Sequence, residues 1–162
     1  MATRKHFIAT WPELNTSVEC APFDDESNIW IYDWYMDYLA RKPIKFIQIH
    51  AMVTGTIMYT WANLDCDLPA QGDHILTKHS IIKAPPGTGL LAYNVPCGLA
   101  GGRTSHITFH YGSEKYEDMT SYYCFHVIDE DLPKLKAVGE EVANRIYRSK
   151  KPVTCVLTLK ED

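Results

Sequence analysis

The chain is short of several features that would define its class. It has no run of eighteen apolar residues, so no part of its 162 residues predicts a membrane-spanning helix. Its first residues, MATRKHFIATW, lack the apolar centre of a signal peptide. Positive charge is not in surplus either, because the formal net charge is −4. We therefore predict no membrane partner and no nucleic-acid partner.

Cysteine shows no pairing pattern. The chain has five cysteines, an odd number, and none of them forms a CxxC pair. This pattern predicts reduced thiols in a cytoplasmic protein rather than a disulfide framework. Repeats, low-complexity stretches and linkers are also missing, which predicts one domain over residues 1–162. The apolar fraction of 46% and the charged fraction of 22% are typical of a globular domain.

The common nucleotide and nucleophile motifs are missing as well. Residues 85–89, PPGTG, lack the Gly-Lys-Ser/Thr ending of a P-loop, and residues 96–103, PCGLAGGR, do not match GxGxxG after a strand. There is no GxSxG elbow. We predict that the protein uses no cofactor.

Seven histidines suggest a metal site, and His106 and His110 are separated like a ligand pair. Their surroundings predict a strand, which rises about 3.3 Å per residue and places the two about 13 Å apart. His74 and His79 have no carboxylate or thiolate nearby at ligand spacing. We predict no metal site.

Segments rich in β-branched and aromatic residues alternate with glycine and proline turns along the chain. Together they predict about eight strands in a mostly antiparallel order, forming a closed barrel or a sandwich, mainly β with two helices. The strand segments are 5–10, 16–20, 45–53, 55–64, 80–84, 89–95, 105–111, 122–129 and 153–160.

Two segments have helical spacing. In residues 28–40 an aromatic stripe recurs at helical intervals, and Asp24, Asp25 or Ser27 can cap its start. Its tryptophans predict either a covered core or the interface of a homo-oligomer. Residues 131–149 show the clearer apolar stripe, with Asp129 or Asp131 as cap and Pro133 in the first turn; the stripe consists of Leu132, Leu135, Val138, Val142 and Ile146.

Histidines recur on the less apolar side of three predicted strands. In SHITFHY (105–111), His106, Thr108 and His110 share one face, opposite Ile107, Phe109 and Tyr111. His50 shares a face with Phe46, Gln48 and Met52, whereas Ile47, Ile49, Ala51 and Val53 form the plainly apolar face. His126 lies opposite Tyr123, Phe125 and Val127. If these strands are neighbours, their imidazoles can line one cavity; otherwise they lie on a solvated face or in the core.

Imidazole is the side chain best suited to proton transfer near neutral pH. Glu114 and Glu117 follow the histidine-rich strand and can orient an imidazole or act as bases, unless they are ordinary surface charges. Arg103 precedes the same strand and can bind a carboxylate with its planar guanidinium. We hypothesise that the histidine face of 105–111 looks into a pocket and that its charged end lines the mouth.

Three stretches carry a resemblance to a known family: IHAMVTGTIMYTW, TFHYGSEKYEDM and CFHVIDEDLPKLKAVGEEV. In this order the chain resembles the cyclophilin-like small β-barrels, and among them the opine-forming branch, the cucumopine and mikimopine synthases. The similarity spans roughly residues 5–160. Its most specific parts are the hairpin from His50 to Gly55, the Tyr-Gly turn after the histidine-rich strand, and the final helix. The resemblance implies a cyclophilin-like closed barrel of about eight strands.

The resemblance also implies a cofactor-free Pictet–Spengler condensation. The amine of L-histidine adds to the ketone of 2-oxoglutarate, the resulting imine is attacked by the imidazole carbon, and a base removes the ring proton. The partners would be small molecules, an amino acid and a 2-oxo acid. For this reaction we predict two sets of residues. The catalytic set is His50, His110 and Glu117, and the substrate-binding set is His106, Tyr111, Arg103, Tyr59 and His126.

Two other functions stay open. A prolyl isomerase of this fold has Phe-His-Arg, whereas this chain has Phe109-His110-Tyr111 without an arginine, which weighs against that activity. A non-catalytic binding or scaffold barrel, or another enzyme of small metabolites, would fit the same fold, because a fold does not define a function.

Overall fold

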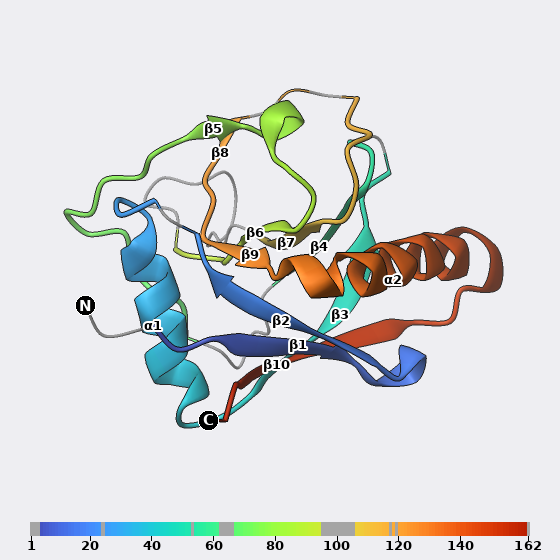
Figure 1. The fold of residues 1–162 in the computed structure, drawn as a ribbon, viewed down its shortest axis with the longest axis horizontal. Helices are drawn as coiled ribbons and strands as arrows, with labels where there is room; N and C mark the ends of the chain where they lie inside the picture. The colour runs from blue at the N-terminus through green and yellow to red at the C-terminus, as the bar shows by residue number, and fades with distance from the viewer. Residues whose placement is uncertain are drawn as a thin grey trace.

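Eight strands close into an antiparallel barrel (Figure 1) within the residues that the structure describes. The structure is a computed structural model, and it describes residues 4–23, 25–52, 54–61, 67–94, 106–116, 118 and 120–161. The order around the barrel is β1-β10-β3-β4-β7-β6-β9-β2, and β2 pairs with β1 to close it. These strands are β1 (Phe7–Trp11), β2 (Thr16–Pro22), β3 (Ile44–His50), β4 (Ile57–Trp61), β6 (Thr88–Leu90), β7 (His106–His110), β9 (Phe125–Val127) and β10 (Val153–Leu159).

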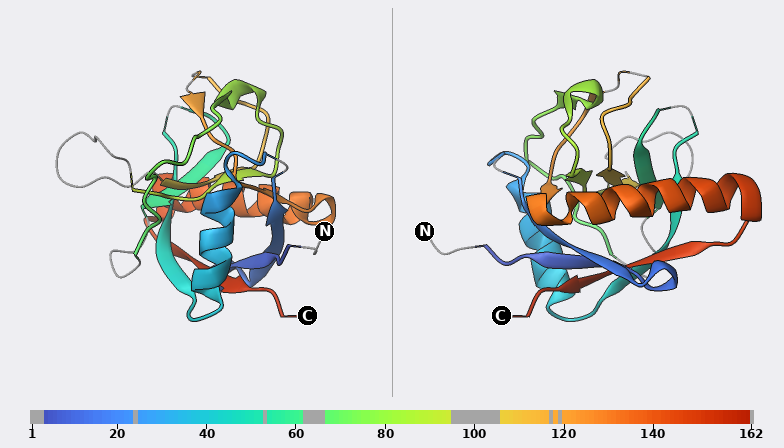
Figure 2. Two further views of the ribbon diagram at one scale, coloured as in Figure 1. Left: turned by 90° about the vertical axis from the view of Figure 1, so that its left-hand side faces the viewer. Right: turned by 45° about the vertical axis from the view of Figure 1, so that its right-hand side comes forward.

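A second, two-stranded sheet lies outside the barrel. It consists of β5 (His79–Ser80) and β8 (Thr120–Ser121). In Figures 1 and 2 it lies over the side of the barrel formed by β6, β7 and β4. The predicted closed barrel with two helices is confirmed, and the small sheet is an addition that the sequence did not indicate.

Three predicted strands are shorter than their sequence pattern suggests. The segment 80–84 continues from β5 into a 3-10 turn, η2 (Ile81–Lys83), and two prolines follow it. Segment 89–95 is in the ladder only as far as Leu90, because the next two carbonyls accept hydrogen bonds from side chains instead. Tyr122 donates to the carbonyl of Leu91 at 3.0 Å, and Tyr35 donates to that of Ala92 at 2.8 Å. In segment 122–129, only the residues of β9 pair with neighbouring strands, β2 and β6.

The helix α2 (Leu132–Asn144) follows a short 3-10 turn, η3 (Asp129–Asp131), and ends in a π-helical turn, η4 (Arg145–Ser149). Its predicted apolar stripe is confirmed, and Pro133 stands in the first turn as expected. Asp131 stands at the N-cap position as predicted, but its side chain makes no capping hydrogen bond. The Asp131 carboxylate instead accepts the backbone N–H of Glu19 at 2.8 Å and pairs with Lys134, which attaches the start of α2 to β2.

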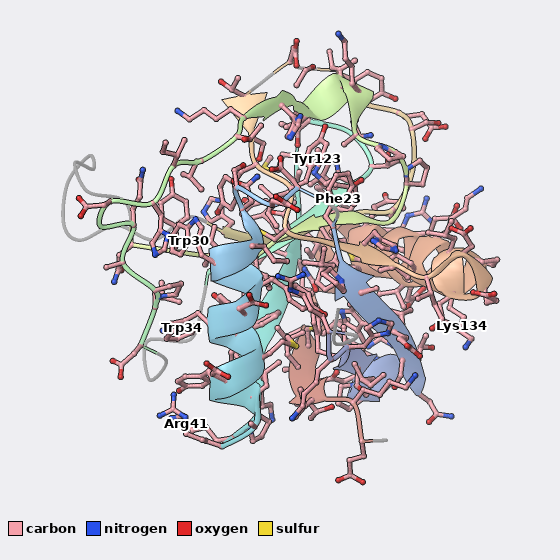
Figure 3. The ribbon with its side chains drawn as sticks, turned by 60° about the vertical axis from the view of Figure 1, so that its left-hand side comes forward. Phe23, Trp30, Trp34, Arg41, Tyr123 and Lys134 are labelled. Atoms are coloured by element: carbon pink, nitrogen blue, oxygen red, sulfur yellow. The ribbon has the colours of Figure 1, made fainter. Side chains whose placement is uncertain are left out.

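The helix α1 (Ile29–Leu39) begins after Asn28, so the predicted cap residues are not at the cap position. Ile31 and Tyr35 are fully buried, whereas Trp30 and Trp34 are half-buried on the outer side of the helix (Figure 3). Trp34 stacks on Tyr38 with ring centroids 5.1 Å apart. The interior face of α1 is therefore core, and a homo-oligomer stays a prediction.

Aromatic rings fill the centre of the barrel. Phe109 lies between Trp11 and Phe125, with ring centroids 5.4 Å and 5.2 Å away in edge-to-face geometry. Phe125 also contacts Phe7 at 5.1 Å. Such contacts add to the free energy of burying the rings, and all four side chains are fully buried.

The face of β3 that points into the barrel is the opposite of the one that its apolar pattern suggests. Phe46, Gln48 and His50 are buried, whereas Ile47 is 58% exposed. Gln48 is accommodated because its amide oxygen accepts the indole N–H of Trp11 at 3.0 Å and its amide nitrogen donates to the carbonyl of Tyr59. A polar residue with both groups satisfied costs little inside a core.

Close approach at Gly139 brings α2 against the end of β7. A Cβ atom added at Gly139 would lie 2.3 Å from the ring of Tyr111, so only glycine fits there. The Tyr111 hydroxyl is hydrogen-bonded to Nε2 of His50 at 2.7 Å, and Nδ1 of His50 is 2.7 Å from the carbonyl oxygen of Ala51. Burial raises the pKa of Tyr111 to about 12 and lowers the pKa of His50. This group joins α2, β3 and β7.

Three of the five cysteines, Cys20, Cys124 and Cys155, are buried free thiols, and Cys66 and Cys97 lie outside the described residues. Burial raises the pKa of Cys124 to about 12, which keeps it protonated. Over the described part of the chain, no helix is long and apolar enough to cross a membrane.

Candidate active site

A pocket of about 450 Å³ lies between the outer face of the barrel and the small sheet. Cavities of this size are typical of small-molecule sites. Its described lining is mostly apolar, with a few polar groups. The lining residues are Ala51, Met52, Thr54, Ile57, Tyr59, Ile81, Leu90, His106, Thr108, His110, Thr120, Ser121 and Tyr122.

The floor of the pocket follows from strand alternation. In β7, Ile107 and Phe109 point into the barrel, so His106, Thr108 and His110 point outward into the pocket. The predicted pocket-facing side of this strand is thereby confirmed. The antiparallel register places Ile57 opposite His110, Tyr59 opposite Thr108, and Leu90 on the other side of Thr108, all on the same face. Tyr59 lies against His106, with ring centroids 4.9 Å apart.

The roof of the pocket consists of residues 79–84 and the described residues 112–116, 118, 120 and 121, which together we call the cap. Two hydrogen bonds join the two segments of the cap to each other, and a third joins the cap to the loop between β3 and β4. Lys115 donates to the carbonyl of Ala84, Ser80 donates to Asp118 at 2.5 Å, and Thr56 N–H donates to the carbonyl of Glu114 at 2.7 Å. Gly55, with φ of +102°, allows this approach, because an added Cβ would lie 2.0 Å from that same carbonyl oxygen.

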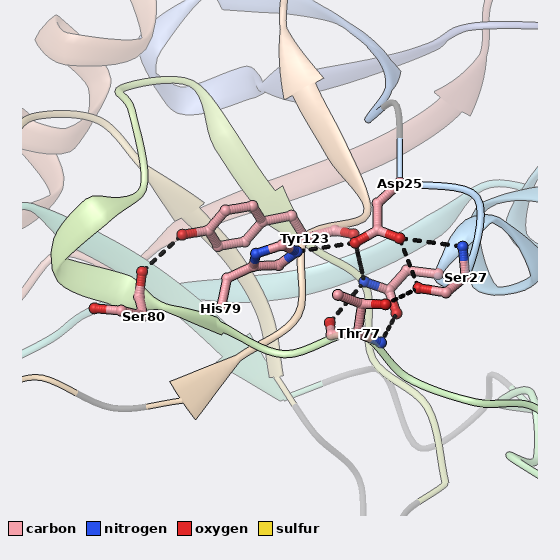
Figure 4. Close-up of polar contacts among 7 residues, drawn as sticks. Asp25, Ser27, Thr77, His79, Ser80 and Tyr123 are labelled. Atoms are coloured by element: carbon pink, nitrogen blue, oxygen red, sulfur yellow. Dashed lines mark hydrogen bonds and ion pairs between the residues drawn. The ribbon is translucent and has the colours of Figure 1, made fainter.

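A polar cluster attaches the cap to the start of α1 (Figure 4). The Asp25 carboxylate accepts a hydrogen bond from Ser27 N–H at 3.1 Å and is 2.9 Å from Nε2 of His79. The ring of His79 stacks on Tyr123 at 4.5 Å, and the Tyr123 hydroxyl donates to the carbonyl of Ser80 at 2.7 Å. The roof therefore depends on a contact between Asp25 and His79, two residues that are 54 positions apart in sequence.

Acid is expected to weaken this attachment. Burial by itself raises the pKa of Asp25, but hydrogen bonds from Ser27 and His79 outweigh it, so the net pKa lies below the ordinary value of 3.8. A carboxyl whose pKa is lowered by folding stabilises the folded state above its unfolded pKa, and this contribution is lost as the pH falls through the folded pKa. We expect the protection factors of the amides of residues 79–80, which correct for the intrinsic exchange rate at each pH, to fall below about pH 4. In Asp25→Asn, hydrogen exchange should show this loss already at pH 7, with no further change on acidification; equal pH profiles for the two proteins would contradict the assignment.

Both pocket histidines are neutral at physiological pH. Burial lowers the pKa of His106, and burial together with the charge of Lys115 lowers the pKa of His110 to about 3. Nδ1 of His110 is buried and has no hydrogen-bond partner in the described part of the chain. The described lining residues include no Asp, Glu, Lys or Arg. The two imidazoles are therefore the described lining groups best suited to accept or release a proton near neutral pH.

The structure brings together some of the predicted site residues and separates others. His106, His110 and Tyr59 line the pocket. His50 and Tyr111 are hydrogen-bonded to each other and do not line it, because His50 points to the interior face of β3. Their predicted roles remain predictions.

The other predicted residues lie elsewhere. His126 is on the same outer face as His110 but on β9, with Thr88 of β6 between them, and it contacts Phe23 instead of the pocket. Glu117 and Arg103 lie outside the described residues. No group of three His, Cys, Asp or Glu side chains that could hold a metal occurs in the described part of the chain.

Sequence reasoning missed the roof. Thr120, Ser121 and Tyr122 line the pocket, yet only Tyr122 belongs to a predicted strand, 122–129, and Thr120 and Ser121 precede it. The sequence pattern places Met52 in a predicted strand, on the face of His50, and Thr54 in the hairpin turn. A segment rich in Ser and Thr between two strands is the one signal that could have suggested a polar lining.

The chain shares its fold with McbB. The structure of McbB in complex with tryptophan matches with a TM-score of 0.75 at 19% sequence identity, over 96% of this chain and 45% of the McbB chain. This chain thus spans less than half the length of the protein it matches. No protein-family model and no curated protein sequence matches it. The barrel that the resemblance implied is therefore confirmed, and its opine-forming branch stays a prediction.

Proposed function

We propose that this barrel is a cofactor-independent synthase that condenses an amino acid with a 2-oxo acid by a Pictet–Spengler cyclisation, with L-histidine and 2-oxoglutarate as the first pair to test. One observation carries the proposal: the pocket floor holds two neutral imidazoles, His106 and His110, at the two ends of β7. Two supports come from elsewhere, the resemblance of the sequence to opine synthases and the shared fold with a protein that binds tryptophan.

The reaction needs proton transfers rather than redox chemistry. The amine adds to the ketone and water leaves, which gives an imine; the ring carbon then forms a bond to the imine carbon, and a base takes the proton from that ring carbon. The product is the sum of the two reactants minus one water. A pocket that holds the reactants face to face lowers the entropic part of the barrier, and a positioned base supplies the proton transfer.

The two histidines suit different roles. A base is most effective when its pKa is near the working pH, and a pKa of about 3 makes His110 a poor proton acceptor. His106 lies at the other end of the floor against Tyr59, and its pKa is lowered by burial alone. We assign the base to His106 and substrate orientation to His110, which exchanges the roles predicted from the sequence.

A mass-spectrometric assay tests the proposal. The purified chain is incubated with L-histidine and a panel of 2-oxo acids, without added metal or cofactor. We expect a product at the summed mass of the reactants minus one water that forms faster with the protein than without it. If no amino acid and 2-oxo acid pair gives such a product, the synthase is refuted, and the alternative of a non-catalytic binding barrel would account for the pocket.

A further inference from the structure

We infer that the corner formed by Thr88 and His110, beside Lys115, binds the carboxylate group of the ligand. The identity of the ligand as a 2-oxo or amino acid rests on the proposed function, whereas the carboxylate site rests on the geometry of this corner. Three independent features of the described residues support it: the register of two strands, two buried polar atoms without partners, and a half-buried ammonium group.

The register of β6 and β7 places Thr88 and His110 side by side. Gly89 is paired with Phe109 and Leu90 with Thr108, so the antiparallel ladder puts Thr88 level with His110. Residues opposite each other in such a ladder point to the same face, with Cβ atoms about 4.5–5.5 Å apart. The face in question is the outer one, because His110 lines the pocket. The corner therefore adjoins the cavity.

Both side chains are almost fully buried, each 1% exposed, and both have an unsatisfied polar atom. Neither Oγ1 of Thr88 nor Nδ1 of His110 has a hydrogen-bond partner in the part of the chain that the structure describes. An unpaired buried polar atom destabilises a protein, and such atoms are rare in native structures. Two in neighbouring positions indicate a missing partner. A hydroxyl and an imidazole N–H can both donate, and a carboxylate accepts with both of its oxygens.

Local charge favours an anion over a neutral acceptor. The ammonium of Lys115 is half-buried and donates to the carbonyl of Ala84, and no described carboxylate forms an ion pair with it. Its charge reaches His110, since Lys115 contributes to the lowered pKa of that imidazole. Glu114, the preceding residue, acts on Lys115 with its negative charge, but no acidic side chain is among the described residues that line the cavity. A carboxylate in the corner would receive two hydrogen bonds and neutralise Lys115.

The cavity next to the corner is mostly apolar, which suits a carboxylic acid with an apolar body as a probe. Ile57, Leu90 and Ile81 line the cavity next to the corner. A matched pair of probes is indole-3-acetate and indole-3-acetamide, which have the same shape and differ in charge. Hydrogen bonds to a charged group are stronger than those to a neutral one, so we expect the acid to bind at least about tenfold more tightly in calorimetric titration at pH 7.

Variants separate the contributions of the corner. Thr88→Val and Lys115→Met should each lower the preference for the acid to about threefold or less, because each should weaken binding of the acid more than binding of the amide. Thr88→Ser keeps the hydroxyl and Lys115→Arg keeps the charge, so both should retain the preference. The thermal unfolding midpoint reports whether each variant has kept its fold.

Equal binding of the two probes to the unaltered chain would overturn the inference, and so would a preference that survives in both Thr88→Val and Lys115→Met. Failure of the acid to bind would overturn it as well. A clear preference for the acid without any condensation product would leave the carboxylate site standing and refute the synthase. The two proposals therefore fail separately.

Discussion

His106→Ala is expected to lower kcat/KM for the condensation by about 10²- to 10⁴-fold, the usual contribution of a positioned general base. The side chain lines the pocket at the start of β7, against Tyr59, and has the imidazole whose pKa is lowered by burial alone. Because a lowered pKa keeps the imidazole neutral at lower pH, kcat/KM of the unaltered protein should begin to fall only below about pH 6.5. Initial rates by mass spectrometry between pH 5 and 8 measure both effects.

The control for this variant is His74→Ala. His74 is an exposed histidine that stacks on Trp30 of α1 and does not line the pocket. Its removal should leave kcat/KM within about twofold. A product yield that drops equally in both variants would indicate loss of folded protein, and unchanged activity in His106→Ala would remove His106 as the base.

Phe109→Ala should destabilise the protein by about 3–5 kcal/mol, the range observed when a buried phenylalanine is truncated in a core. Phe109 is fully buried and contacts both Trp11 and Phe125, so its loss leaves a cavity at the centre of the barrel. It also stands between Thr108 and His110 in β7, so the pocket floor depends on it. Urea unfolding followed by tryptophan fluorescence measures the free energy of unfolding.

Tyr116→Ala is the matched aromatic truncation. Tyr116 is 76% exposed, and removing an exposed side chain of this kind normally changes stability by no more than about 0.5 kcal/mol. A loss of less than about 1 kcal/mol in Phe109→Ala would contradict the packing of the barrel interior described above.

Much of the fold could be predicted because local patterns and tertiary structure agree. The stripe of α2 recurs at helical spacing and is buried at Leu135, Val138 and Val142. The alternation in β7 separates Phe109 from His110 correctly. The alternation in β3 predicted the wrong inward face. Ile47, on the apolar face, is solvent-exposed, whereas Gln48 and His50 are buried. The pattern could not show this, since it depends on the hydrogen bonds that Trp11 and Tyr111 make with them across the barrel.

The candidate site divides in the same way. That His106 and His110 share a face follows from the period of a strand, and both line the pocket. That His50 does not line the pocket with them follows from no local pattern, because it depends on which face of β3 points into the barrel. The neighbour of His110 on β6, Thr88, could not be identified either, since strand register is a property of pairs of strands.

The amino-acid sequence alone was sufficient for the class of fold, the approximate number of strands, the two helices and the histidine face of β7. These depend on periodicity and turn chemistry within short windows. The roof of the pocket, the attachment of His79 to Asp25, the corner of Thr88 with His110 and the neutral state of the imidazoles were decided only by the tertiary structure. The reason is physical: burial, cross-strand register and long-range hydrogen bonds arise between segments far apart in sequence, and no local pattern contains them.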